Sequence, residues 1–406
     1  MSWSFSAFET LYGVPSRNGI YKSSEHHGDG AKIVNMGELF AHEFVGPQDM
    51  SRLTMSEAEL EKAGLVDGDL LFGRRSLVEA GAGKCSVVEG LVGPTTFESS
   101  IIRVRLDLEK ALPRFYYYWF RSRLGRGSIR AIVSGTNVKG IRGSELKNVL
   151  VPMLDLDDQL RISDALSAYD NLIENNRRRS VLLEESARLL YRKWFVHLRF
   201  PGHEHVKVAH GVPEGWGRTL LPALIDINPT ERIDRAKEAW YVPMAALSET
   251  GMIVDRRDFE RRTSHTAVKF RNGDVLLARI TPCLENGKTA FVYFLDEDEV
   301  ACGSTEFIVL RGMKISSHFV YCLSRTYDFR EHAIKSMIGS SGRQRVQTSC
   351  FSEYLTPLPP SLLLREFDCS VEPMFEQIVV LQRENEKLSQ ARDLLLPRLM
   401  SGEIQV

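Results

Sequence analysis

The sequence predicts an α+β fold in which two mixed α/β domains are joined by two long antiparallel coiled-coil helices, with an internal pseudo-two-fold repeat. Three observations predict it. Segments of the first half return in the second half at a nearly constant spacing. Short β-branched and aromatic runs bounded by Gly, Pro and Asn indicate sheet-rich portions. Two later stretches, rich in Leu, Glu, Arg and Gln and almost free of Gly, indicate long helices.

The repeat is the strongest of these signals. Four groups of residues recur in the same order, between 205 and 208 positions later. The matched groups are Val34, Met36 and Leu39 with Val242, Met244 and Leu247; Gly68-Asp69 with Gly273-Asp274; Ser99, Ile102 and Val104 with Ser304, Phe307 and Val309; and Val138, Ser144, Glu145 and Pro152 with Val346, Ser352, Glu353 and Pro360. Each match alone is weak, but their collinear order favours a duplicated unit over a coincidence of generic patterns.

The changes in composition give the expected boundaries. We expect a first globular domain at 1–154, a central helix at 155–199, a second globular domain at 200–360 and a C-terminal helix at 361–406. A duplicated globule and helix can close on itself about a pseudo-two-fold axis, which lays the two helices antiparallel.

Each expected helix carries an apolar seam at heptad spacing, which is typical of a helix that packs on another helix. The seam residues are Leu166, Ile173, Asn176, Leu183 and Leu190 in the first helix, and Ile378, Leu381, Asn385, Leu388 and Leu395 in the second. A single polar seam residue commonly fixes register, although a solvated asparagine on an imperfect stripe remains the alternative. Pro373 and Pro397 predict that the second helix is regular only between them.

Composition excludes several classes of protein. There are 52 Lys and Arg against 53 Asp and Glu, so a uniformly cationic nucleic-acid binder is excluded and any such contact must come from local patches. The six cysteines form no CxxC pair and no His cluster accompanies them, so we expect reduced thiols. The first residues lack the pattern of a signal peptide, and no run of eighteen apolar residues occurs, which predicts a cytoplasmic protein.

Two local patches are cationic. Residues 121–147 contain seven cations against one anion, and residues 325–345 contain five against two. Cations interspersed with Gly, Ser, Asn and Gln suit contacts with phosphates and base edges, and Arg pairs well with guanine while Asn or Gln pairs with adenine. With residues near two strand ends, the candidate DNA-binding residues are Arg74, Arg75, Arg126, Arg130, Asn137, Lys139, Arg142, Arg279, Lys288, Arg343, Gln344 and Arg345. A solvated basic surface is the alternative.

The first helix suggests a ruler. A helix over 155–195 would be roughly 60 Å long at ~1.5 Å per residue. B-DNA repeats every ~34 to 36 Å, so this length corresponds to one to two turns of duplex. Two domains held by such helices would read two short sequences separated by a spacer.

The sequence resembles the specificity subunit of type I restriction-modification systems over nearly its whole length. The resemblance rests on two target-recognition domains alternating with two long helices and on distinctive segments. These are GDLLFGRR, SGTNVKGIRGSELKNVLVP, ARLLYRKWFVHLRFPG, VPEGWGRTLL, GSSGRQRV and RDLLLPRLMSGEI.

The resemblance implies a subunit without catalytic activity of its own. It implies that the chain directs two methyltransferase subunits, and restriction subunits in the full complex, to a bipartite asymmetric site on double-stranded DNA. It further implies that S-adenosylmethionine, ATP and Mg are held by partner subunits and that this chain holds no cofactor.

Catalytic and metal-binding functions for the chain itself fit the sequence less well. A self-contained methyltransferase needs a second Pro and an aromatic residue after Asn228-Pro229, where the chain has Thr and Glu. For a nuclease that holds a metal ion with carboxylates, the sequence offers only the short pattern Glu145-Leu146-Lys147. The run GAGKCS at 81–86 lacks the first Gly and the hydroxyl residue of a phosphate loop, and His203, His205 and His210 lack partners at metal-ligand spacing.

A non-DNA coiled-coil adaptor, with protein-binding heads on a helical scaffold, is the alternative from another class. Salt dependence separates the two, because several phosphate contacts make DNA affinity fall steeply with salt.

Overall fold

The computed structural model describes residues 3–77, 79–234, 237–264, 266–340 and 342–404. The chain divides into two compact units. Unit 1 comprises Met1–Ile173 and Lys387–Val406, and unit 2 comprises Glu174–Glu386. Each unit therefore contains one globular portion and a part of both long helices, which is a different division from four consecutive segments.

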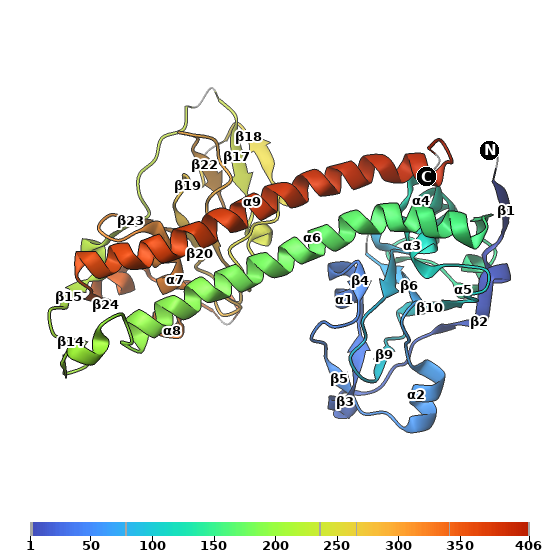
Figure 1. Cartoon of the computed structure of the whole chain (residues 1–406), viewed down its shortest axis with the longest axis horizontal. Helices are drawn as coiled ribbons and strands as arrows, with labels where there is room; N and C mark the ends of the chain where they lie inside the picture. The colour runs from blue at the N-terminus through green and yellow to red at the C-terminus, as the bar shows by residue number, and fades with distance from the viewer. Residues whose placement is uncertain (1–2, 78, 235–236, 265, 341, 405–406) are drawn as a thin grey trace. The chain divides into compact units, whose positions relative to one another are not determined.

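The two long helices are continuous. Helix α6 spans Leu156–Tyr191 (36 residues) and passes into a π-helical turn at Arg192–Val196, and helix α9 spans Ser361–Met400 (40 residues; Figure 1). The prediction that α9 is regular only between Pro373 and Pro397 is wrong, since the helix extends beyond both. Both prolines are exposed, so the carbonyl groups freed by the missing N–H groups can be hydrated while the opposite face packs.

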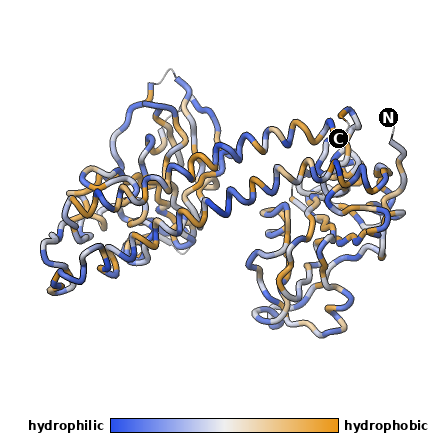
Figure 2. The backbone as a smooth tube through the Cα atoms, in the orientation of Figure 1, coloured by the Kyte–Doolittle hydropathy of each residue, from blue (hydrophilic) through white to orange (hydrophobic). Residues whose placement is uncertain are grey.

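The helices pack antiparallel within each unit. In unit 1 the start of α6 shares a core with the end of α9, through Leu166 and Leu399. In unit 2 the end of α6 shares a core with the start of α9, through Tyr191 and Phe367, whose ring centroids lie 6.0 Å apart. Apolar and polar residues alternate along both helices in Figure 2, as expected for helices with one buried face.

Unit 1 is built on a five-stranded sheet of order β2-β10-β6-β8-β4, beside a three-stranded sheet β5-β3-β9 and the pair β1-β12. The strands are β1 (Ser4–Ala7), β2 (Tyr12–Asn18), β3 (His27–Val34), β4 (Phe44–Val45), β5 (Arg52–Leu53), β6 (Leu70–Gly73), β8 (Cys85–Val88), β9 (Thr95–Phe97), β10 (Ile101–Leu106) and β12 (Leu150–Met153). The helices are α1 (Met36–Ala41), α2 (Glu57–Ala63), α3 (Pro113–Arg121), α4 (Arg123–Ala131) and α5 (Gly143–Leu146). Helix α3 is aromatic and wholly buried from Phe115 to Phe120, so it anchors the sheet to α6 and α9.

Unit 2 repeats this plan with a four-stranded sheet β16-β23-β20-β21, a second sheet β18-β17-β22-β19 and the pairs β15-β24 and β13-β14. The strands are β13 (Val208–Ala209), β14 (Val212–Pro213), β15 (Gly217–Leu220), β16 (Ile225–Ile227), β17 (Ala239–Val242), β18 (Glu260–Arg262), β19 (Val268–Phe270), β20 (Val275–Ala278), β21 (Thr289–Phe291), β22 (Ala301–Gly303), β23 (Phe307–Gly312) and β24 (Leu355–Leu358). Helices α7 (Ser317–Ser324) and α8 (Tyr327–Lys335) take the places of α3 and α4.

One ion pair demonstrates the repeat at the level of side chains. Arg105 Nε donates to Asp69 Oδ1 over 2.7 Å in unit 1, and Arg311 Nε donates to Asp274 Oδ1 over 2.6 Å in unit 2. Both aspartates follow a matched Gly, and both carboxyl groups are buried. The fold class predicted from the sequence is confirmed.

No helix among the described residues is long and apolar enough to span a bilayer. All six cysteines are described, and all are free thiols.

Candidate nucleic-acid interface

In unit 1 a loop is pinned against the end of strand β6. Arg74 follows the last residue of β6, its N–H donates to the Ser100 carbonyl over 2.8 Å, and its carbonyl accepts from the Ile141 N–H over 3.0 Å. The short strands β7 (Arg75–Ser76) and β11 (Lys139–Gly140) extend the contact as an antiparallel pair. Main-chain hydrogen bonds thus place the 134–142 loop beside the strand end.

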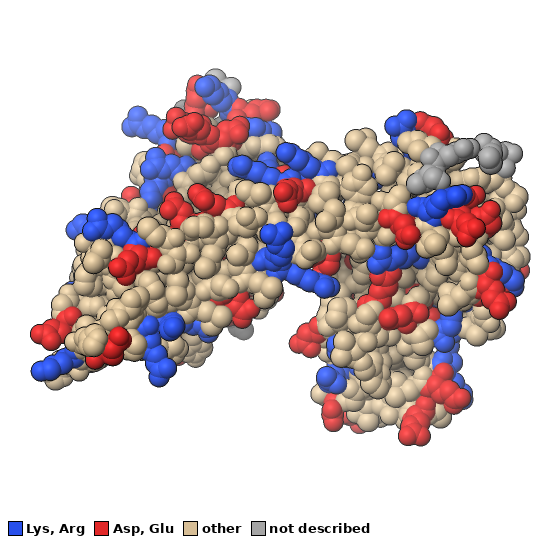
Figure 3. Space-filling view, viewed as in Figure 1, with Lys and Arg blue, Asp and Glu red and all other residues tan. Residues whose placement is uncertain are grey.

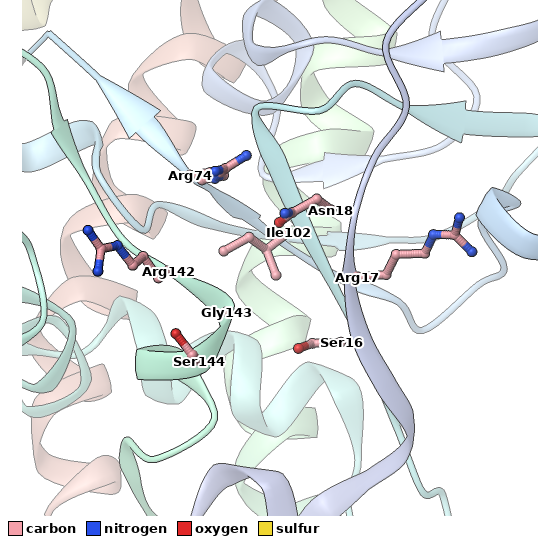
Figure 4. Close-up of a pocket in the computed structure, with 8 residues that line it drawn as sticks. All are labelled: Ser16, Arg17, Asn18, Arg74, Ile102, Arg142, Gly143 and Ser144. Atoms are coloured by element: carbon pink, nitrogen blue, oxygen red, sulfur yellow. The ribbon is translucent and has the colours of Figure 1, made fainter.

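A polar pocket of about 370 Å³ opens at this place. Its lining residues are Ser16, Arg17, Asn18, Arg74, Ile102, Arg142, Gly143 and Ser144. Figure 4 shows Arg74, Arg142 and Asn18 around Ile102, while the Arg17 side chain points away from them. The Arg17 guanidinium instead donates to the Lys62 carbonyl over 3.1 Å. Two guanidinium groups, an amide and two hydroxyl groups supply the donors and acceptors that phosphates and base edges require.

The other unit 1 candidates differ in their exposure and in their contacts. Arg75 and Asn137 are exposed, Arg130 lies 3.9 Å from Glu79, and Lys139 Nζ donates to the Gly135 carbonyl over 2.9 Å. Arg126 instead lies partly inside the unit. Its guanidinium donates to the Gly83 and Ala82 carbonyls over 2.9 and 3.2 Å, and burial lowers its pKa. Its described contacts therefore hold the loop that follows β7.

Unit 2 builds the same frame from different side chains. Arg279 follows the end of β20, donates from its N–H to the Glu306 carbonyl over 2.9 Å, and accepts at its carbonyl from the Val346 N–H over 2.8 Å. The bridge between Ile338 and Arg345 corresponds to the bridge between Ser134 and Gly140 in unit 1.

These contacts revise one detail of the sequence repeat. Val346 occupies the place of Ile141, 205 positions earlier, whereas the sequence match paired it with Val138 at 208. Likewise Pro357, opposite Arg218 in β15, stands where Pro152 stands opposite Phe5 in β1. Pro360 is therefore not the counterpart of Pro152. The shift of 205 persists to the end of the sheet, so matching residue types alone misplaced the last segment by three positions.

The unit 2 candidates gather around this frame with one exception. Arg345 makes a bidentate pair with Glu306, with donor–acceptor distances of 2.7 to 3.0 Å, and this hydrogen bonding raises the pKa of Arg345. Arg343 is exposed, and the Gln344 carbonyl accepts from the Thr281 N–H over 3.0 Å. Lys288 lies elsewhere, where its Nζ donates to the Met244 carbonyl over 3.2 Å.

Arg279 presents one group without a partner. Its Nη2 donates to the Val346 carbonyl over 3.0 Å, while its Nε is buried and makes no hydrogen bond within the described part of the chain. A buried N–H group without a hydrogen bond lowers the stability of the fold unless a ligand accepts from it, so Arg279 is well placed to meet an acceptor.

Sequence reasoning missed several residues of these sites. Ser16, Asn18 and Ser144 line the unit 1 pocket, and Glu306 orients Arg345 in unit 2. The sequence signal was a run of cations, whereas Glu306 is acidic and Asn18 lies on a strand far earlier in the chain. Pairing of β2 with β10, with Asn18 opposite Ile102, brings it to the site.

The seam residues lie on the packed faces of the helices. Leu166, Ile173, Ile378 and Leu381 are buried, and Leu183, Leu190, Leu388 and Leu395 are partly buried. Asn176 Nδ2 lies 3.4 Å from Glu384 Oε2, and Asn385 Oδ1 is buried without a partner in the described residues. Both asparagines are 6% exposed, so neither is a solvated surface residue.

Surface charge is mixed. On the face in Figure 3, Lys and Arg are interspersed with Asp and Glu. Among the described residues, no group of three or more His, Cys, Asp or Glu is arranged to hold a metal ion. The Asn228 side chain accepts from the Val309 N–H over 2.9 Å, so it serves the sheet.

No protein-family model matches the chain. Among curated proteins, the chain is 25% identical over 304 residues to the type I restriction enzyme MjaIX specificity subunit of Methanocaldococcus jannaschii, covering 72% of this chain and 69% of that protein. It is 21% identical to the HindI specificity subunit of Haemophilus influenzae, covering 92% and 94%. It is 31% identical to the EcoEI specificity subunit of Escherichia coli over 155 residues, which is 26% of that protein.

A solved structure shares the fold. The S subunit of a type I restriction-modification system from M. genitalium superposes with a TM-score of 0.55 at 16% identity, covering 98% of this chain and 96% of that one. The resemblance to type I specificity subunits is therefore confirmed in sequence and in fold.

Proposed function

We propose that this chain is the DNA-sequence specificity subunit of a type I restriction-modification complex. It binds a bipartite asymmetric site on double-stranded DNA, with each unit reading one half of the site. Methyltransferase subunits, and restriction subunits in the full complex, act where this chain places them. This chain carries out no catalysis by itself, and S-adenosylmethionine, ATP and Mg serve the partner subunits.

The observation that carries the proposal is the repeated loop frame. In both units a main-chain hydrogen bond of 2.8 to 3.0 Å ties a hydrophobic residue of a polar loop to the Arg that follows a central strand. The frame is the same, but the side chains around it differ. Lys139, Gly140 and Arg142 of unit 1 correspond to Gln344, Arg345 and Gln347 of unit 2 at the 205 shift. Two identical frames with different donors and acceptors would recognise two different base sequences.

The relatives support this role, since they are named as specificity subunits of type I restriction enzymes. The continuous helices α6 and α9 support a fixed spacer between the two half-sites, because a helix of this length is a stiff element on the scale of a duplex turn.

Selection from a duplex library tests the proposal. The purified chain, assembled with its methyltransferase partners, should enrich two short and different sequences at one spacing, and should methylate adenine within them. Enrichment of a palindrome or of no sequence would contradict it. A purely protein-binding adaptor would show no duplex affinity at any salt concentration.

A further inference from the structure

Unit 2 contains a second pocket, away from the frame around Arg279. It has a volume of about 520 Å³ and lies between the end of α6, the helices α7 and α8 and the loop that precedes Gly287. Arginines dominate its wall: Arg188 and Arg192 from α6 and its π-helical turn, and Arg325 and Arg330 from the α7–α8 corner, with Glu285 and Tyr327 beside them.

The positive charge of this pocket is poorly matched within the unit. The carboxylate nearest to Arg188 is that of Glu184, 3.8 Å away. Its two oxygens already accept from the Tyr321 hydroxyl over 2.6 Å and from the Met252 N–H over 2.8 Å. Glu331, also in the wall, pairs with Lys335 over 2.9 Å.

The remaining arginines find no carboxylate among the described residues. Arg192 is exposed, and its side chain makes no described hydrogen bond or ion pair. Arg325 donates to the carbonyls of Gly287 and Glu249 over 2.6 and 3.3 Å, and Arg330 donates to the carbonyl of Glu285 over 2.7 Å. Burial, then the charges of Arg325 and Arg188, lower the pKa of Arg330. Among the described ion pairs, only that of Arg188 with Glu184 offsets the positive charge of these four arginines.

Unit 1 provides the comparison, because Arg121 and Arg126 hold the same positions. Each unit has an arginine directly before a helix-capping hydroxyl residue and another four positions after it; the capping residues are Ser122 and Thr326. In unit 1 the first arginine, Arg121, makes two hydrogen bonds of 2.9 Å to the Glu43 carboxylate.

Unit 2 lacks that carboxylate. The repeat that pairs Leu39 with Leu247 places Gly251 where unit 1 has Glu43. In the long helices the buried positions match at a shift of 205, as Tyr191 matches Leu396, so Arg188 and Arg192 stand where unit 1 has the exposed residues Asp393 and Pro397. Unit 2 therefore lacks the Glu43 side chain and carries Arg188 and Arg192 where unit 1 has an acidic residue and a proline.

Two atoms in the wall indicate the chemistry of the missing partner. Arg330 Nε and Glu285 Oε2 are both buried, and neither has a hydrogen-bond partner within the described residues. A ligand that satisfies both must accept one hydrogen bond and donate another. A phosphodiester of DNA offers acceptors but no donor, whereas a peptide with acidic side chains offers carboxylate oxygens and backbone N–H groups.

We propose that this pocket binds an acidic peptide segment of a partner protein, with carboxylates of the segment paired with the arginines of its wall. The pocket goes beyond DNA reading, since none of its arginines belongs to the loop frame. Bidentate pairing of a carboxylate with a guanidinium group gives both affinity and orientation.

Fluorescence anisotropy with a labelled N-acetyl-hexaglutamate peptide tests the proposal on the full chain. The Arg188→Gln, Arg192→Gln double variant should bind the peptide at least tenfold more weakly than the unaltered chain. The matched control is Arg178→Gln, Arg179→Gln, which removes two exposed charges from the same helix. It also removes one pair with a Glu four residues earlier, Arg178 with Glu174, as Arg188 is removed from Glu184. The control should bind as the unaltered chain does.

Three results would overturn the proposal: no binding of hexaglutamate, equal binding by the pocket variant and the control, or equal binding of a neutral hexaglutamine peptide. Displacement of the peptide by inorganic phosphate at matched ionic strength and similar concentration would also count against it. If the double variant fails to fold, Arg192→Glu gives a second test, since this exposed side chain makes no described contact. Duplex affinity should stay unchanged in these variants, so failure here is distinguishable from failure of the proposed DNA reading.

Discussion

The hydroxyl group of Tyr118 donates a hydrogen bond of 2.5 Å to Asp170 Oδ2, and both side chains are buried. The other carboxylate oxygen, Oδ1, accepts from Arg392 over 2.5 Å. One carboxylate therefore ties α3 of the globular portion to α6 and α9 within unit 1. It gives the aromatic helix a fixed position on the paired long helices.

Replacement of Asp170 by Asn should destabilise unit 1 by about 3 kcal/mol, because it leaves the buried Arg392 guanidinium without its main counter-charge. Tyr118→Phe removes only a hydrogen bond and should cost about 1 kcal/mol. Urea unfolding measures both values. The exposed Asp164→Asn on the same helix is the control and should change stability little. Equal effects of Asp164→Asn and Asp170→Asn would contradict this role.

Replacement of Arg343 and Arg345 by Gln should weaken recognition of the half-site read by unit 2 and leave discrimination at the other half-site unchanged. The reason is that both side chains project from the loop held by Arg279. Competition binding with duplexes altered in one half-site at a time measures this. Arg365→Gln, on the exposed face of α9, is the control. A uniform loss across unrelated duplexes would indicate phosphate contact alone.

Replacement of Glu306 by Gln should reduce sequence discrimination more than total affinity. Glu306 holds the Arg345 guanidinium through a bidentate pair, and a freed guanidinium can still meet phosphates. The ratio of affinities for matched and mismatched duplexes is the measurement. An unchanged ratio would show that the pair does not orient the arginine for reading.

Removal of Arg142 should reduce the salt dependence of duplex binding by about one unit in the slope of log affinity against log salt, if its guanidinium meets a phosphate. Its exposed position at the mouth of the 370 Å³ pocket permits such a contact. Arg126→Gln offers a contrast, because the described contacts of Arg126 go to Gly83 and Ala82. That variant should lower thermal stability and leave the salt slope unchanged.

Stability should fall as the pH is lowered through the range below about 6.5, because the half-buried His318 ring packs against Phe291 and Phe375. The centroid of its ring lies 5.4 Å from that of Phe291 and 4.7 Å from that of Phe375. Burial holds the pKa of His318 below the ordinary value of 6.5, although the carboxylates of Glu372, Asp368 and Glu376 act in the opposite direction. The unfolded chain then binds a proton more readily than the folded one. The His318 contribution is complete above the unfolded pKa and is lost as pH falls towards the folded pKa. The free energy of unfolding, measured with urea at pH 7.5 and 5.5, should differ less between the two pH values in His318→Gln than in the unaltered chain.

Insertion of seven residues at matching places in α6 and α9 should lengthen the preferred spacer by about 10 Å, or roughly three base pairs, at ~1.5 Å per helical residue. Selection from a duplex library with variable spacing measures the change. Insertion into only one helix should destroy the pairing instead. A spacer that stays constant in the double insertion would refute the ruler.

The sequence predicted the parts that arise from periodicity and repetition. Heptad spacing indicated α6 and α9, and matched Gly-Asp pairs indicated two similar sheets. The sequence did not predict which distant segments of the chain lie side by side. Asn18 reaches the unit 1 pocket only through the register of β2 with β10, and Glu306 reaches Arg345 only because two loops meet. Arg126 and Lys288 are residues of a type that commonly contacts DNA, yet both side chains donate hydrogen bonds to backbone carbonyls inside their units.

The loop frame around Arg74 and Arg279 is held by main-chain atoms: the amide of Ile141 or Val346 and the carbonyl of the arginine. Replacing neighbouring side chains leaves those bonds in place. If the loop reads DNA as proposed, point mutations of its side chains would change the target sequence while the main-chain frame keeps the fold, and the two units could change their specificities independently.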